Sequence, residues 1–260
     1  MMRALYSGTT GMRGQQLQLD TISNNLANAN TAGFKKSRVQ FEDLYYQEMR
    51  AVGAENIDGG QVPSGIQVGL GVLATSNQKV FTQGSIQESG NDLDMAIEGR
   101  GFFQIIRDGE EFYTRAGAFT RDADGFIVTQ NGDRLQPEFQ IPADTVTVSV
   151  DARGVIQTKD AQQNVTGEAQ LTLHNFINPS GLRAEGGNLF RPTLASGDPV
   201  ESNPGVDGTG VVLQRFIEVS NVDVTEEMVN LIITQRAFEM NSKSVQTADQ
   251  LLEVANTLKR

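Results

Sequence analysis

The sequence predicts an α+β protein, with long helices at the two ends of the chain that pair in a coiled-coil-like inner domain. Between them it predicts a central, mainly antiparallel β-rich domain. The terminal segments carry apolar residues at heptad spacing, which is typical of packed helices. The centre carries short apolar runs separated by turns, and most of the 27 glycines lie there, between residues 53 and 210.

The longest helical pattern is the last one, residues 223–258, which contains no Gly and no Pro. At 1.5 Å per residue this helix would be roughly 50 Å long. Its apolar stripe consists of Leu231, Phe238, Val245 and Leu252, seven residues apart. The alternate seam positions after Met228 are polar, namely Gln235, Ser242 and Asp249. So thin a stripe cannot bury the helix by itself, and we expect it to need partners.

The N-terminal segment repeats this pattern and predicts a helix over residues 3–28. Its stripe consists of Leu5, Met12, Leu19 and Leu26, and the alternate positions are Thr9, Gln16 and Ser23. Gly8, Gly11 and Gly14 lower its intrinsic helicity by up to about 1 kcal/mol each relative to Ala. We expect Gly33 to take the positive φ that ends the segment.

Three asparagines near the end of this helix, Asn24, Asn25 and Asn28, are open to two interpretations. Asn favours helix termini and turns, because its side chain bonds to nearby backbone groups. The alternative is a set of hydrogen bonds between subunits. Neither interpretation involves catalysis.

The segment after the helix reads as an extended leg followed by a short amphipathic turn, residues 34–49. From residue 50 to 71 the chain is Gly-rich and lacks periodicity. A loop of this length predicts a binding or assembly loop, or a disordered linker. Residues 72–219 read as strands joined by turns, with a possible lobe at residues 140–190. The predicted domains are therefore 1–45 with 222–260, the insert 46–71, and the β-rich domain 72–221.

Composition excludes several classes of function. The net charge of −11 argues against nucleic-acid binding, and the absence of Cys removes thiol catalysis and Cys-based metal sites. No apolar run approaches the roughly 18 residues of a membrane span. The N-terminus lacks the features of a cleaved secretory signal. From composition alone we expect a cytoplasmic protein without membrane insertion.

The candidate chemical motifs are weak. Gly69-Leu70-Gly71 has the spacing of a dinucleotide loop but does not join a strand to a helix. Asp122 and Asp124 lack the rest of a calcium loop and read as a hairpin turn. His174 is the single histidine and reads as structural. We therefore predict no catalytic, cofactor-binding or metal-binding residues, and no enzyme activity.

Three stretches resemble the axial protein family of the bacterial flagellum, which includes rod and hook proteins. They are Ile22–Lys35 (ISNNLANANTAGFK), Asp94–Phe103 (DMAIEGRGFF) with Tyr113–Gly117 (YTRAG), and Ser220–Val224 with Glu226–Asn230 and Gln235–Lys243. The resemblance covers essentially the whole chain. Within the family, the length and the insert that ends in Val62, Pro63, Ser64 and Gly65 are similar to those of the distal rod subtype.

The resemblance implies a structural subunit that assembles into a rigid hollow rod, which transmits torque and encloses an export channel. It implies export through the flagellar type III apparatus without a cleaved signal, and a place in the basal body across the periplasm toward the outer membrane. This overrules the cytoplasmic expectation. The implied partners are other copies of the chain, proximal rod proteins, the hook protein or hook junction, the rod cap, and the peptidoglycan-ring and outer-membrane-ring bushing proteins.

The residues expected at the subunit interface are the two apolar stripes, the asparagine cluster, Phe34 and the polar positions Gln235, Ser242 and Asp249. The tetrapeptide Val62–Gly65 is expected to contribute rigidity. Two alternatives stay open. One is a proximal rod or hook subunit of the same family, and the other is a ligand-binding or enzymatic β-protein that its terminal helices dimerise.

Overall fold

The computed structural model describes residues 2–50 and 64–257, and these residues form two compact units. Unit 1 consists of Met1–Leu26, Ser37–Gln78 and Asp223–Arg260, and unit 2 of Ala27–Lys36 and Lys79–Val222. The chain is therefore α+β, with one long helix near each end and a β-rich centre.

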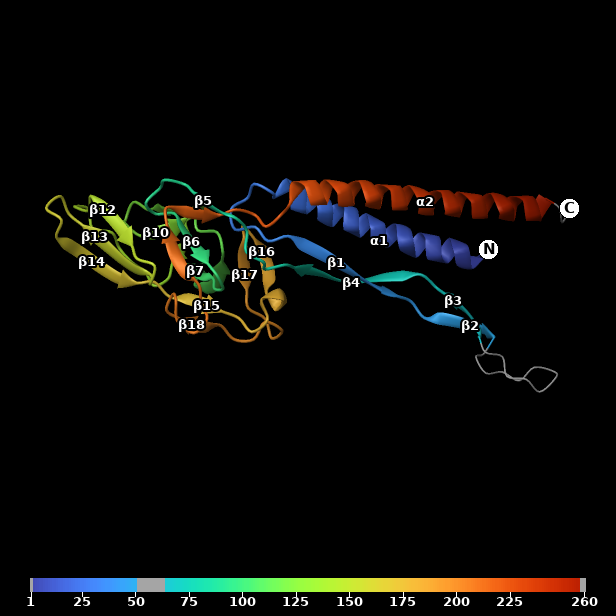
Figure 1. The fold of residues 1–260 in the computed structure, drawn as a ribbon, viewed down its shortest axis with the longest axis horizontal. Coiled ribbons are helices and arrows are strands. Elements are labelled where there is room, and N and C mark those ends of the chain that lie inside the picture. The colour runs from blue at the N-terminus through green and yellow to red at the C-terminus, as the bar shows by residue number, and fades with distance from the viewer. Residues whose placement is uncertain (1, 51–63, 258–260) are drawn as a thin grey trace. The chain divides into compact units, whose positions relative to one another are not determined.

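Unit 1 contains the two helices, α1 (Met2–Ala27) and α2 (Val224–Thr257), which run side by side (Figure 1). Both extents agree with the heptad patterns to within one or two residues. Asp223 caps the N-terminus of α2, because its carboxylate accepts hydrogen bonds from the backbone N–H groups of Thr225 at 2.8 Å and Glu226 at 3.2 Å. Acidic residues in the first turn of α2 also match the positive end of the helix dipole.

A two-stranded ribbon completes unit 1. Strands β1 (Ser37–Asp43) and β4 (Val72–Lys79) pair with each other, and β2 (Tyr46–Arg50) pairs antiparallel with β3 (Ile66–Gly69). The amphipathic turn expected at the end of residues 34–49 was wrong, because residues 46–50 form a strand. The aperiodic loop expected over residues 50–71 likewise contains β3. Residues 51–63 of that loop lie outside the described residues.

Unit 2 is built from antiparallel sheets. The largest is seven-stranded, in the order β16-β17-β8-β7-β11-β10-β9, and a three-stranded sheet has the order β12-β13-β14. Two-stranded sheets pair β15 with β18, β19 with β6, and β20 with β5. The strands are β5 (Ile86–Glu88), β6 (Met95–Glu98), β7 (Phe103–Arg107), β8 (Glu110–Thr114), β9 (Phe119–Arg121), β10 (Ile127–Thr129), β11 (Arg134–Leu135), β12 (Thr147–Val150), β13 (Val155–Lys159), β14 (Val165–Gln170), β15 (Leu173–Asn175), β16 (Arg183–Gly186), β17 (Leu189–Arg191), β18 (Val200–Ser202), β19 (Val211–Gln214) and β20 (Phe216–Glu218), with a 3-10 turn at Pro179–Gly181.

Turn residues fix this topology where the sequence predicted turns. Strands β7 and β8 form a hairpin in which Arg107 pairs with Glu110. The two residues between them, Asp108 and Gly109, both have positive φ, 53° and 82°, as a tight hairpin of this kind requires. Arg215, where φ is 67°, separates β19 from β20.

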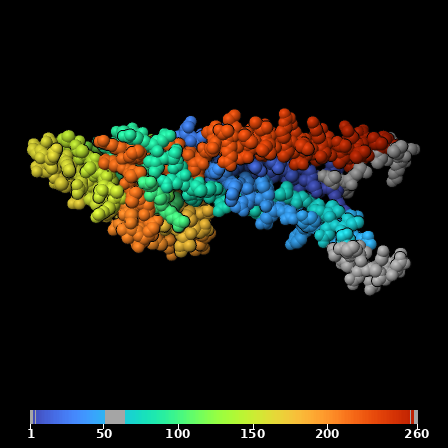
Figure 2. Space-filling model, viewed as in Figure 1, coloured from blue at the N-terminus to red at the C-terminus, as the bar shows by residue number. Residues whose placement is uncertain are grey.

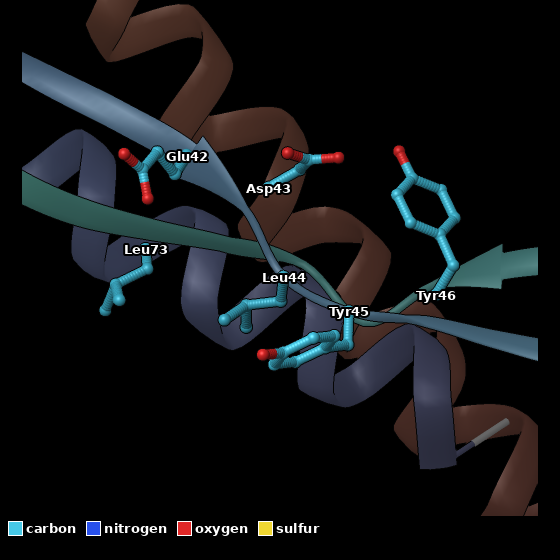
Figure 3. Close-up of a pocket in the computed structure, with 6 residues that line it drawn as sticks. All are labelled: Glu42, Asp43, Leu44, Tyr45, Tyr46 and Leu73. Carbon is cyan, nitrogen blue, oxygen red and sulfur yellow. The ribbon is translucent and has the colours of Figure 1, made fainter.

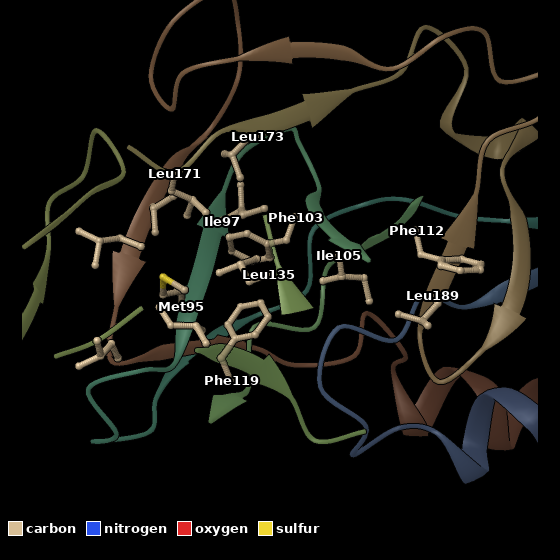
Figure 4. Packing of buried hydrophobic residues seen from close by; sticks show 14 residues of the cluster. Met95, Ile97, Phe103, Ile105, Phe112, Phe119, Leu135, Leu171, Leu173 and Leu189 are labelled. Atoms are coloured by element: carbon tan, nitrogen blue, oxygen red, sulfur yellow. The ribbon is translucent and has the colours of Figure 1, made fainter. Parts of the chain in front are cut away.

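The main core of unit 2 lies between these sheets (Figure 4). Its most deeply buried side chains include Phe103, Ile105, Phe119 and Leu173, each 0% exposed. A second cluster is mainly aromatic and consists of Phe102, Tyr113, Phe176, Leu182 and Phe190, with Phe81 packed against it. The lobe expected at residues 140–190 is partly right: β12–β14 form their own sheet, but β16 and β17 belong to the large one.

Candidate assembly surfaces

Glycines let the two helices of unit 1 approach each other closely. A Cβ atom added at Gly8 would lie 2.8 Å from Cγ2 of Val245, and one added at Gly11 would lie 2.9 Å from Nδ2 of Asn241. Distances below about 3.0 Å are too short for a Cβ contact. Two of the three glycines that lower the helicity of α1 therefore occupy positions where α2 passes close by.

The predicted apolar stripe of α2 faces this seam, but the residues that complete the seam are not the ones that we expected. Leu231, Phe238, Val245 and Leu252 are all half-buried. The seam is completed by Glu227, Thr234, Asn241 and Ala248, which are also spaced by seven residues. Glu227, Thr234 and Ala248 are 5%, 3% and 6% exposed, whereas Met228 is 53% exposed. Gln235 and Asp249 are exposed and Ser242 is half-buried. The expectation that these three residues are the alternate seam positions was therefore wrong, whereas their place at a subunit interface stays a prediction.

The stripe of α1 shows the same shift. Leu5, Met12, Leu19 and Leu26 are half-buried, while the expected alternate positions Thr9, Gln16 and Ser23 are exposed. Ile22, three residues after Leu19, is buried, with 4% of its surface exposed. α1 also contacts the β ribbon, where a Cβ atom added at Gly14 would lie 3.0 Å from Phe41.

Asn25 connects three elements of unit 1. Its amide donates to the carbonyl of Ser37 and accepts from the Ser37 N–H, both at 2.9 Å, which ties β1 to the end of α1. The same amide lies 3.4 Å from the buried carboxylate of Glu227 on α2. Asn25 is therefore occupied within unit 1. Of the other two asparagines, Asn24 is exposed and Asn28 is half-buried.

Two further predicted sites have different outcomes. Phe34 is buried in unit 2, where the ammonium of Lys79 lies 4.3 Å from its ring centre. The tetrapeptide expected to contribute rigidity lies mostly outside the described residues, because Val62 and Pro63 belong to the range 51–63. Ser64 is exposed and Gly65 is half-buried.

The outward face of α2 carries an apolar stripe that the sequence reasoning missed. Met228, Val229, Ile232, Ile233 and Met240 are between 51% and 70% exposed. At 100° per residue these positions fall on the side of the helix opposite the α1 seam. The spacing of Val229, Ile232, Ile233 and Met240 in the sequence could have indicated this second stripe. The surface of α2 is the red strip in Figure 2.

The ribbon of unit 1 exposes a second apolar surface. All five residues of β2 are exposed, and Tyr45, Met49 and Ile66 are 89%, 61% and 52% exposed. A shallow pocket is lined here by Glu42, Asp43, Leu44, Tyr45, Tyr46 and Leu73. Figure 3 shows Tyr45 and Tyr46 pointing in different directions from neighbouring positions. An isolated two-stranded hairpin is at best marginally stable in water, so this surface favours a partner.

Unit 2 contains a buried ionic cluster formed by Lys35, Arg115 and Glu218. The ammonium of Lys35 lies 2.5 Å from one carboxylate oxygen of Glu218, and the guanidinium of Arg115 lies 3.4 Å from the other. The side chains are 0%, 6% and 0% exposed. Burial lowers the pKa of Lys35 and that of Arg115, while Glu218 opposes both shifts. Three segments distant in sequence thus meet at one carboxylate, a contact that the sequence reasoning did not anticipate.

The residues that we considered for chemical roles, His174 and Asp122, take part in packing and in a turn. His174 lies in β15, buried against Tyr113 with ring centres 5.3 Å apart, and burial lowers the pKa of its imidazole. Asp122 and Gly125 close a tight turn through a 3.0 Å backbone hydrogen bond. Within residues 2–50 and 64–257, no cluster of three or more His, Cys, Asp or Glu could hold a metal ion.

These surfaces define a class of protein: a subunit whose exposed helix face and ribbon are suited to packing in an assembly. Three family models match the chain. They describe a flagella basal body rod protein over residues 5–35, the flagellar hook protein FlgE/F/G D1 domain over residues 96–158, and the flagellar basal body rod FlgEFG protein C-terminal region over residues 213–258.

Full-length relatives agree with the family models. The chain is 44% identical to the flagellar basal-body rod protein FlgG of Buchnera aphidicola subsp. Schizaphis graminum, over 99% of this chain and 100% of the relative. It is 42% identical to the protein of that name from Borreliella burgdorferi, over 100% of both chains. Identity to that of Caulobacter vibrioides is 43%, over 99% of this chain and 100% of the relative.

The chain therefore belongs to the flagellar basal-body rod protein family. Its relatives are structural proteins of the flagellar rod, so the chain is a structural subunit and not an enzyme. The enzymatic alternative left open by the sequence is thereby removed. Among the described residues, no helix is both long and apolar enough to cross a membrane.

Proposed function

We propose that the chain is the subunit of the distal rod, a stiff hollow helical polymer that transmits torque from motor to hook and encloses the export channel. The observation that carries this proposal is the outward apolar stripe of α2 in a member of a rod protein family. A helix with apolar side chains on two opposite faces needs two partners, and α1 supplies only one of them. Neighbouring subunits would supply the second.

The proposed assembly has three parts. Residues 1–45 and 222–260 would form the inner domain, with α1 and α2 packed in a coiled-coil-like manner around the channel. Residues 72–221 would form the outer domain, and residues 46–71 would lock neighbouring subunits together. The exposed polar positions Gln235 and Asp249, with Ser242, would face neighbouring subunits or the channel. Leu5, Met12, Leu19 and Leu26 would hold the inner domain together.

The proposed surroundings follow from the same role. The subunit would be exported through the flagellar type III apparatus without a cleaved signal and would polymerise across the periplasm toward the outer membrane. Its other partners would be proximal rod proteins, the hook side, the rod cap and the two ring bushings. A proximal rod or hook subunit is the alternative, and labelling the protein along isolated basal bodies would separate these positions.

The test is concentration-dependent filament formation by the purified chain, viewed by negative-stain microscopy. We expect the double substitution Ile232→Ser and Ile233→Ser to abolish filaments while leaving the melting temperature of the monomer nearly unchanged, because both side chains are exposed. The matched control is Val146→Ser with Val165→Ser, which removes exposed apolar groups from unit 2. Equal filament formation by both variants would contradict the proposal.

A further inference from the structure

Unit 2 has a pocket with an aromatic floor that the proposed assembly does not use. Its volume is about 380 Å³. The rings of Phe81 and Phe176 both pack edge-on against Phe102, with ring centres 5.5 Å and 5.6 Å from it. All three line the pocket, together with Ile177 and Pro179. The floor is therefore preformed by aromatic packing and suits an apolar side chain.

The charged groups of the pocket are both cationic. Arg100 and Arg115 both line it. Arg115 belongs to the buried cluster that also holds Lys35 and Glu218, and this cluster has two cations for one carboxylate. None of the ion pairs formed within the described part of the chain includes Arg100. The pocket is thus bordered by positive charge that this unit does not neutralise.

One buried donor of Arg115 lacks a partner. Its Nη1 and Nη2 atoms donate to the carbonyls of Ile97 and Gly99, and Nη1 also lies near Glu218. Its Nε atom is buried and has no hydrogen-bond partner, although the residue is only 5% exposed. A buried unsatisfied donor on a cation is costly, so unit 2 holds Arg115 beside the pocket without satisfying all of its donors.

We propose that this pocket binds a surface segment of a second copy of the chain, one in which a carboxylate stands next to an apolar side chain. The apolar group would rest on Phe102 and its neighbours, and the carboxylate would approach Arg100, which lines the pocket and is exposed. The chain has a net charge of −11 and offers such pairs, for example Glu48–Met49 and Glu253–Val254, whose side chains are exposed. The inference rests on the proposed function, because it takes copies of the chain as neighbours.

The test uses the purified full-length chain with the photo-crosslinking residue p-benzoylphenylalanine in place of Ile177. That position lines the pocket and is 88% exposed, so the replacement should not affect folding. After irradiation, covalent dimers are quantified on gels and the captured peptide is identified by mass spectrometry. The matched control places the same residue at Val165, an exposed apolar position in the same unit and outside the pocket.

We expect dimers from position 177 and few from position 165, with the captured peptide containing an Asp or Glu beside an apolar residue. Adding Arg100→Glu should reduce the dimer yield at least about fivefold, because like charges would then meet, whereas Arg100→Lys should retain most of it. Equal yields from positions 177 and 165, or no effect of Arg100→Glu, would overturn the inference.

Negative-stain images of the same samples separate this inference from the proposed function. Filaments without dimers from position 177 would reject the pocket and leave the rod proposal standing. Dimers without filaments would support the pocket as a contact between copies and count against the rod. The absence of both would reject both.

Discussion

At the scale of single residues, the balance of buried charges influences the stability of unit 2. Glu218 accepts hydrogen bonds from Lys35 and from the backbone N–H of Gly84, the latter at 2.9 Å, and pairs with Arg115. Taking charges out of water is expensive unless each is paired. A single carboxylate that compensates two buried cations is therefore a more sensitive position than either cation.

This asymmetry makes a prediction for two substitutions. Glu218→Gln leaves two buried cations without a counter-charge and should lower the free energy of unfolding by about 3–5 kcal/mol. Lys35→Met leaves one cation facing one carboxylate and should cost less than half as much. Urea denaturation followed by circular dichroism measures both values. Equal losses would show that the excess charge of the cluster has no energetic consequence.

His174 gives the chain a pH dependence of defined sign. Burial holds the pKa of its imidazole below the ordinary 6.5, so the unfolded chain binds a proton at a higher pH than the folded chain does. Stability is therefore fully present above pH 6.5 and is lost as the pH falls below it, by up to about 1.4 kcal/mol per pH unit. We expect His174→Gln to flatten the fall of the melting temperature between pH 6.5 and 5. Since His174 is the only histidine, parallel curves for the two proteins would refute this assignment.

At the scale of elements, unit 1 depends on how closely α1 and α2 approach. A glycine in a helix costs up to about 1 kcal/mol relative to alanine, so Gly8→Ala would stabilise an isolated α1. In the folded chain the new methyl group would meet Val245, whose branched side chain has little freedom to move. Overpacking typically costs 1–3 kcal/mol, which exceeds the gain in helix propensity.

We therefore expect Gly8→Ala to destabilise the chain by roughly 1 kcal/mol in thermal or urea unfolding. Thr9→Ala, at the exposed neighbouring position, should stay within about 0.5 kcal/mol of the parent. Adding Val245→Ala to Gly8→Ala should recover part of the loss, which a double-mutant cycle would detect as coupling. A stabilised Gly8→Ala variant would mean that the helices do not approach as described.

At the scale of the whole molecule, the proposed function is mechanical and depends on what joins subunits. The insert between β2 and β3 is the segment whose resemblance led us to expect the distal rod subtype. Its residues 51–63 lie outside the described ranges. Of the strands that flank it, β2 is exposed throughout and β3 is exposed at Ile66 and Gln67, and within the described residues they pair only with each other. An exposed two-stranded ribbon has few means of stability of its own, so a role in contacts between subunits is a natural inference.

This role predicts the effect of deleting Arg50–Gln67. We expect the β-rich domain of the variant to fold, with an unchanged melting transition, and its filaments to bend more easily than those of the parent. The persistence length of filaments in electron micrographs measures the difference. Filaments of equal stiffness would show that the insert does not contribute to the stiffness of the rod.

The sequence by itself determined the two helices, their apolar stripes and the positive φ of 70° at Gly33. These are local properties, set by the 3.6-residue repeat and by the absence of a Cβ atom. Only the tertiary structure decided which neighbours complete the seam. A heptad stripe at Leu231 and Phe238 is compatible with burial of either Thr234 or Gln235, and the partner helix selects the first. The cluster of Lys35, Arg115 and Glu218 was equally inaccessible from sequence, because no local pattern encodes contacts between segments far apart in the chain.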